Sequence, residues 1–252
     1  MTGNPTLRER LANGEEVLGA WSVLSHPLAA ELTARGGFGY VCVDMQHGTA
    51  DLSHLLGMVQ AIELGGGTPI ARVPWNEPGV IGRALDFGCH GVIVPMVNTA
   101  EQARAVVKAC RYSPQGSRSW GPTAAGLRTP DYRNWAMNSI AVIPMIETVE
   151  ALENLDEILA VPGIDAAYVG PADLAISLGL GPTGNDGNPA FDNALNSIVA
   201  ACLRHGVVPA IHSDGPTAPR RRAQGFKMIT VAADSTALAA GLADAQRAAS
   251  AE

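Results

Sequence analysis

Lysine is almost absent from this chain, and charge of any kind is sparse. Of 252 residues only Lys108 and Lys227 are lysines, charged residues make up 16%, and the formal net charge is −7. Both lysines fall away from any predicted rim of active-site residues, so Schiff-base chemistry is not expected. The acidic balance argues against a nucleic-acid partner, because phosphates require excess Lys and Arg. The one basic cluster, residues 220–222, is typical of a solvated helix face.

Several recognition motifs are also missing. There is no Gly-Lys pair, which excludes a phosphate-binding P-loop, and no G-x-G-x-x-G follows the first apolar run. The four cysteines show no C-x-x-C spacing, and Cys42 and Cys89 lie in apolar surroundings, which predicts free thiols in a reducing compartment. Neither a signal peptide nor an apolar run of bilayer length is visible. We therefore expect a cytoplasmic protein with no membrane partner.

Short apolar runs alternate with helical patterns along the whole chain, which is 47% apolar. Strands are predicted at residues 17–24, 40–44, 68–74, 91–96, 141–148, 166–174, 207–211 and 227–231. Helices are predicted at residues 27–34, 52–64, 78–87, 99–111, 149–159, 191–205 and 236–249. Without a linker between them, these units predict a single α/β domain over residues 1–252, a (β/α)₈ TIM barrel whose active face lies at the strand C-termini. A doubly wound open sheet is the alternative.

Two of the predicted strands end in a carboxylate. Glu147 closes the run 141–148 and Asp173 closes the run 166–174, with a predicted helix between them. Strand, helix and strand in that order make a parallel pair, so both carboxylates should emerge at one edge, within reach of one hard metal ion. Alternatively, each carboxylate begins the following helix as a cap. Gly170, Pro171 and Ala172 would bring exposed backbone beside Asp173, which favours a binding site.

Four other side chains should reach the same edge. Arg72 lies in an apolar run, where a guanidinium needs an anion, either a substrate or a rim carboxylate. His47 is a loop histidine or, beside a metal and an arginine, a general base. Trp21 is either core or the wall of a substrate pocket, and His212 follows the seventh strand.

Five segments resemble the class II pyruvate aldolases of the HpcH/HpaI aldolase family. The match runs in order from about residue 19 to residue 240, and its GPADL and RVPW segments together are fairly specific. These segments are DMQH at residues 44–47, RVPW at 72–75, VPMV at 94–97, IET at 146–148 and GPADL at 170–174.

The resemblance implies a lyase that reversibly cleaves a 4-hydroxy-2-oxo acid into pyruvate, or hydroxypyruvate, and an aldehyde, as in aromatic or sugar-acid catabolism. Glu147 and Asp173 would hold Mg²⁺, Mn²⁺ or Co²⁺, which acts as a Lewis acid on the forming enolate. Arg72 would stabilise the enolate charge and His47 would act as general base. Backbone near Ala172 would bind the substrate carboxylate.

The resemblance also implies an oligomer, a trimer or hexamer with a swapped last helix. Asp86 matches an aspartate thought to raise the basicity of the histidine. In its own barrel Asp86 precedes the fourth strand, at the end opposite to the active face. If it assists His47, a neighbouring subunit should supply it.

Three positions depart from the family pattern and leave the aldehyde open. Gln46 stands where a glutamate is usual, Met145 where a glutamine often contacts substrate, and His212 where an apolar residue is common. Two other functions stay open. One is an acyl-CoA lyase of the citryl or malyl type, which would need a basic surface for CoA phosphates. The other is a non-catalytic barrel that binds an oxo acid.

Overall fold

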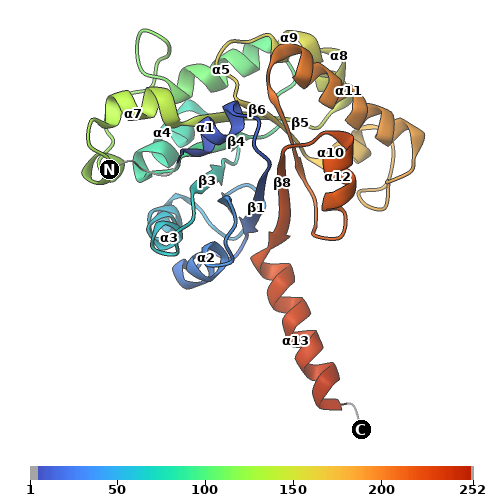
Figure 1. The fold of residues 1–252 in the computed structure, drawn as a ribbon. Helices are drawn as coiled ribbons and strands as arrows, with labels where there is room; N and C mark the ends of the chain where they lie inside the picture. Colours follow the sequence, from blue (N-terminus) through green and yellow to red (C-terminus); the bar gives the residue numbers. More distant parts are fainter. Residues whose placement is uncertain (1–4, 251–252) are drawn as a thin grey trace.

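Eight parallel strands close into a barrel in chain order, from β1 beside β2 round to β8 beside β1 (Figure 1). The structure is a computed structural model that describes residues 5–250. The closed barrel of eight parallel strands confirms the predicted (β/α)₈ TIM barrel. The strands are β1 (Val17–Ser22), β2 (Tyr40–Asp44), β3 (Pro69–Arg72), β4 (Gly91–Val94), β5 (Ala141–Ile146), β6 (Ala166–Val169), β7 (Val208–His212) and β8 (Met228–Ala233).

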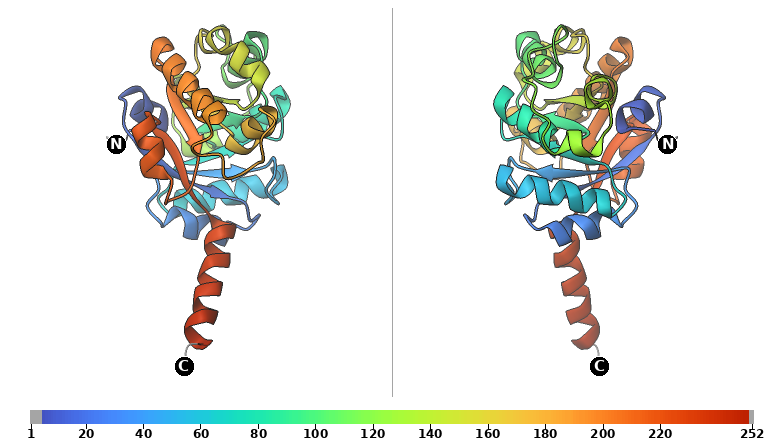
Figure 2. Two further views of the ribbon diagram at one scale, coloured as in Figure 1. Left: turned by 90° about the vertical axis from the view of Figure 1, so that its right-hand side faces the viewer. Right: turned by 90° about the vertical axis from the view of Figure 1, so that its left-hand side faces the viewer.

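Helices other than α13 surround the barrel and bury apolar residues in its core. Figure 2 shows this outer layer from two sides. Within residues 5–250 the helices are α1 (Leu7–Ala12), α2 (Pro27–Ala34), α3 (Leu52–Leu64), α4 (Pro78–Phe87), α5 (Ala100–Cys110), α6 (Ala125–Arg128), α7 (Tyr132–Ser139), α8 (Val149–Glu153), α9 (Leu155–Leu159), α10 (Pro171–Ser177), α11 (Pro189–His205), α12 (Ala218–Gln224) and α13 (Asp234–Ser250).

The barrel interior is a packed core around one buried hydroxyl. The Thr230 hydroxyl forms hydrogen bonds with the hydroxyls of Tyr40 (2.8 Å) and Tyr168 (2.6 Å), which come from strands on different sides of the barrel. The Tyr40 ring lies where a side chain on Gly19 would be, since a Cβ there would come within 1.9 Å of the ring. Gly19 therefore makes room for the aromatic layer that fills the barrel.

Some predicted elements need correction. The predicted helix over residues 149–159 is two short helices joined at Asn154 (φ −98°, ψ 12°), whose backbone N–H still donates to the Glu150 carbonyl. The Asn154 side-chain amide donates to the Asn98 carbonyl (2.9 Å). The predicted strand over 166–174 ends at Val169, and Pro171 begins α10. The long segment 112–128 ends in α6. The helices α1, α7, α10 and α12 were not among the predicted ones.

The last helix, α13, projects away from the barrel (Figures 1 and 2) and buries none of its residues. Leu238 and Leu242 on this helix are 56% and 64% exposed. Its first residue, Asp234, is anchored to the loop after β1, because its carboxylate accepts the N–H groups of Val23 (2.9 Å) and Leu24 (3.2 Å). None of the helices within residues 5–250 is both long and apolar enough to cross a bilayer.

Candidate active site

A buried ion pair joins the carboxyl ends of β2 and β3. Arg72 donates from Nε to Asp44 Oδ1 (2.8 Å) and from Nη2 to Asp44 Oδ2 (2.6 Å), a two-pronged geometry. Burial opposes the charge on Asp44, but the bonds from Arg72 outweigh it and hold the pKa of Asp44 below its ordinary value. The anion that Arg72 required is thus a rim carboxylate, although neither Glu147 nor Asp173.

The same carboxylate shapes the turn that carries His47. Asp44 Oδ1 also accepts the backbone N–H groups of Gln46 (3.1 Å) and His47 (3.3 Å). Gly48 completes the turn, and a Cβ at that position would lie 2.2 Å from the Asp44 carbonyl oxygen. The His47 side chain is exposed beside this turn. Asp44 therefore fixes both Arg72 and the backbone of the predicted base.

Glu147 directly follows β5 and is only 2% exposed. Its Oε1 accepts the backbone N–H of Met96 (2.8 Å), while its buried Oε2 has no partner among residues 5–250. Burial, and to a lesser extent the nearby charge of Asp173, raises the pKa of Glu147 to about 7. Gly170 leaves space for Oε2, because a Cβ there would lie 2.2 Å from this oxygen. One carboxylate oxygen is thus held and the other is left for a ligand.

The residues at this edge fit a hard divalent cation. Glu147 Oε2 and the carboxylate of Asp173 are the oxygen donors that Mg²⁺ and Mn²⁺ prefer, and a bound cation would offset the buried charge. Asp173 lies in the first turn of α10 and not at the end of β6. In residues 5–250 no cluster of three or more His, Cys, Asp or Glu side chains suits a metal, so further ligands would have to come from substrate and water.

Trp21 lies between the core and the rim. Its ring packs against the rings of Tyr168 (5.6 Å) and His212 (4.9 Å, edge to face) and under the guanidinium of Arg72 (5.2 Å). It therefore belongs to the core and lies beside the candidate site. Burial, and to a lesser extent the Arg72 charge, lowers the pKa of His212 to about 4, so this imidazole is neutral at pH 7.

Asp86 lies near the end of α4, ahead of β4, and the single chain does not bring it to His47. It pairs with Arg118 (2.7 Å), whose guanidinium lies over the ring of Tyr112 and donates to the hydroxyl of Tyr132 (3.0 Å). The residues of the predicted rim otherwise gather at the carboxyl ends of the strands.

Several site residues had no predicted role. Asp44 was expected at the end of the second strand, and it lies in register with Arg72 on the next strand. Ser213 and Asp214 directly follow His212 and could have been found in the same way. Met96 contributes a backbone N–H from a left-handed conformation (φ 55°), for which a methionine gives no sequence signal.

Glu147 should make the stability of EDTA-treated protein depend on pH. The folded state holds this proton up to a pKa of about 7 and the unfolded state only to about 4.5, so the free energy of unfolding should fall as pH rises between these values. The loss should reach about 3 kcal/mol above pH 7. Glu147→Gln should remove this part of the dependence in urea unfolding measured from pH 4 to 8. Equal pH slopes in both proteins would contradict this environment for Glu147.

Comparisons with known proteins agree with this geometry. Residues 18–240 match the family model described as HpcH/HpaI aldolase/citrate lyase. The chain is 38% identical to a hydroxypyruvate/pyruvate aldolase of Rhizorhabdus wittichii (90% of this chain, 91% of the relative). It is 35% identical to a 4-hydroxy-2-oxo-heptane-1,7-dioate aldolase of Klebsiella pneumoniae (94% of this chain, 91% of the relative).

The structural comparison gives the same result. A crystal structure of an HpcH/HpaI aldolase/citrate lyase family protein from Burkholderia cenocepacia superposes with a TM-score of 0.90 at 33% identity, over 97% of this chain and 99% of that one. Sequence and fold therefore agree over nearly the whole length, and this chain belongs to the HpcH/HpaI aldolase/citrate lyase family.

Proposed function

We propose that this protein is a class II aldolase, which reversibly cleaves a 4-hydroxy-2-oxo acid into pyruvate, or hydroxypyruvate, and an aldehyde. The observation that carries the proposal is the unpartnered Oε2 of Glu147, close to Asp173 and on the same rim as the Arg72–Asp44 pair. The aldolase names of the relatives at 38% and 35% identity support it.

The reaction itself defines what the site must do. A base removes the proton of the C4 hydroxyl, the C3–C4 bond breaks, and the aldehyde leaves. The electron pair remains on the three-carbon fragment as an enolate, which takes up a proton at C3 to become pyruvate. The site must therefore stabilise negative charge at the 2-oxo oxygen and move one proton.

Glu147 and Asp173 would hold the divalent cation, Mg²⁺, Mn²⁺ or Co²⁺, which when bound supplies Lewis-acid stabilisation of the charge at the 2-oxo oxygen. Asp44 occupies Nε and Nη2 of Arg72, which leaves Nη1 to donate to the same oxygen. Arg72 is thus oriented before substrate arrives, and no reorganisation is needed during the reaction.

The other residues bind substrate and move the proton. His47, exposed on the turn that Asp44 fixes, accepts the hydroxyl proton, directly or through water. The backbone of residues 170–172 binds the substrate carboxylate, and Trp21 forms the adjacent wall. This arrangement needs no lysine, which agrees with the scarcity of lysine in the chain, where there are only two.

An acyl-CoA lyase is the less favoured alternative. Its CoA phosphates would need free basic side chains, yet the basic cluster at residues 220–222 is engaged. Arg220 pairs with Asp192, Arg221 with Asp186 and Arg222 with Glu16. Arg221 is buried, so the expectation of a fully solvated basic face was wrong.

We also propose that the protein is a cytoplasmic trimer or hexamer in which α13 packs on a neighbouring subunit. An apolar hollow of about 370 Å³ lies between α2 and the first turns of α13, and Leu32 and Leu238 both line it. Covering this hollow and the exposed leucines of α13 would remove apolar surface from water. In such an assembly a neighbour would supply Asp86 to His47. The four buried free cysteines suit a reducing compartment.

Replacement of Arg72 by lysine should slow the exchange of pyruvate methyl protons with D₂O by about 10²-fold or more, because the two-pronged donor is lost. Proton NMR with Mg²⁺ present measures this rate. Arg111→Lys is the matched control, since Arg111 is a buried arginine at the opposite end of the barrel that donates to the Ile140 carbonyl. Arg111→Lys should lose stability but keep its exchange rate. Wild-type exchange in Arg72→Lys would refute the assigned role.

Removal of the second carboxylate should abolish metal-dependent activity. Asp173→Ala leaves one protein oxygen ligand, so exchange and oxaloacetate decarboxylation should fall to background at any Mg²⁺ or Mn²⁺ concentration tested. Circular dichroism and thermal unfolding should resemble those of EDTA-treated wild type, because the side chain is at the rim. Full activity without added metal would show that the cation site is assigned wrongly.

Polar substitution of α13 should dissociate the oligomer. The double variant Leu238→Asp, Leu242→Asp puts two charges on the proposed contact, and sedimentation velocity should shift toward monomer at micromolar concentration. Leu203→Asp is the control, since Leu203 is 68% exposed on α11. A monomeric wild type would contradict the proposed assembly.

A further inference from the structure

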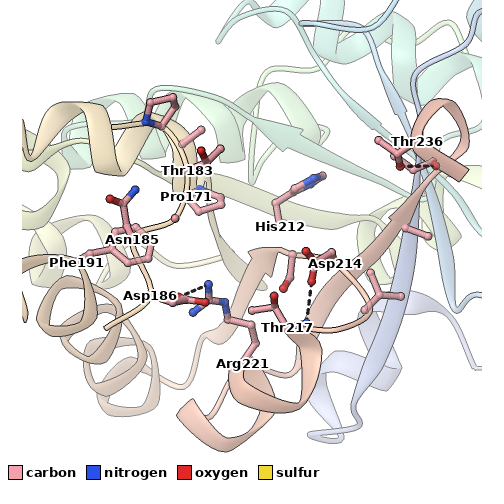
Figure 3. A pocket seen from close by; sticks show the side chains of 17 residues that line it. Pro171, Thr183, Asn185, Asp186, Phe191, His212, Asp214, Thr217, Arg221 and Thr236 are labelled. Carbon is pink, nitrogen blue, oxygen red and sulfur yellow. Dashed lines mark hydrogen bonds and ion pairs between the residues drawn. The ribbon is translucent and has the colours of Figure 1, made fainter. Parts of the chain in front are cut away.

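A second cavity adjoins the candidate site on the side of β7 and β8. It has a volume of about 680 Å³, within the range of small-molecule pockets. Pro171 and Ala172 line it from the side of the proposed pyruvate site, and His212 lines it from the end of β7. Figure 3 shows these residues together with loop residues Thr183 and Asn185. The cavity is therefore continuous with the place where an aldehyde would meet the enolate.

The charges in this cavity do not cancel. Arg221 and Asp186 form an ion pair (2.7 Å), so their charges offset each other (Figure 3). Asp214 accepts hydrogen bonds from Thr217, which hold the pKa of its carboxyl below the ordinary value and keep it ionised at pH 7. His212 is neutral at this pH. One uncompensated negative charge, on Asp214, remains.

Two residues that line the cavity carry a buried polar atom without a partner. The buried hydroxyl of Ser213 has no partner among residues 5–250. Nε of Arg221, a residue that is only 5% exposed, has no partner there either. Buried polar groups without a partner are costly unless a ligand or water engages them. Thr183 and Asn185 add further polar groups to the wall. Such a lining matches a ligand with several hydroxyls better than an alkyl chain.

We propose that this cavity receives the aldehyde and selects a neutral hydroxyaldehyde over an anionic semialdehyde. The inference rests on the proposed aldolase function and adds the class of the acceptor. Asp214 repels a second carboxylate, while Ser213 and His212 hydrogen-bond to substrate hydroxyls.

Three four-carbon aldehydes test the proposal on the full-length protein with Mg²⁺ and pyruvate. D-Erythrose is neutral and hydroxylated, butanal is neutral and apolar, and succinic semialdehyde is anionic. For the wild type, kcat/KM at equal free-aldehyde concentration should be about tenfold or more higher for erythrose than for succinic semialdehyde, as expected for one nearby charge. A preference for succinic semialdehyde would overturn the proposal.

Two variants separate the charge from the hydrogen bonds. Asp214→Asn keeps the shape of the side chain and an acceptor oxygen for Thr217. It should raise kcat/KM for succinic semialdehyde relative to kcat/KM for erythrose by about tenfold. Ser213→Ala should lower kcat/KM for erythrose about fivefold to tenfold relative to kcat/KM for butanal, which is the loss expected for one hydrogen bond. Glu157→Gln is the control, because it removes an exposed carboxylate on α9, and it should leave both ratios unchanged. Unchanged ratios in both cavity variants would refute the assignment.

Pyruvate methyl exchange distinguishes failure of this inference about the acceptor from failure of the proposed aldolase function. Exchange with metal together with reversed or absent acceptor selectivity would overturn this inference and leave the aldolase standing. No exchange and no addition to any of the three aldehydes would overturn both.

Discussion

The Asp44–Arg72 ion pair is the interaction on which the rest of the candidate site depends. One buried carboxylate joins two neighbouring strands and also holds two amides of the turn before Gly48. Loss of either partner would leave an uncompensated buried charge, which typically costs 3–5 kcal/mol. The position of His47 and the stacking of Arg72 on Trp21 both follow from this pair. Stability and chemistry therefore rest on the same few atoms.

The strands could be predicted from the sequence because they depend on local pattern. The apolar run before Glu147 ends with β5, and parallel connection places β6 beside it, whereas Asp173 lies beyond the end of β6, in α10. No glycine or proline marks the turn at Asn154 in the sequence. The anchoring of Asp234 to Val23 could not be predicted from local pattern, because the two residues lie 211 positions apart in sequence.

The candidate site was predictable only in part for the same reason. Arg72 needed an anion, but sequence alone could not choose between a substrate and Asp44, and the structure allows it to serve both. The environment of Glu147 depends on the Met96 backbone. The charge of the second cavity depends on the pairing of Asp186, in the loop after α10, with Arg221 of α12. Pairings between distant segments set these properties, and one sequence does not display them.

The anchor of α13 at Asp234 has a mechanical consequence. The helix leaves the barrel, yet its first residue is tied to Ser22, Val23 and Leu24, which directly follow Trp21. Any force on the protruding helix would act on β8, which it directly follows, and through Asp234 on this loop. Contacts made by α13 would therefore bear on residues that adjoin the tryptophan that packs against Arg72 and His212.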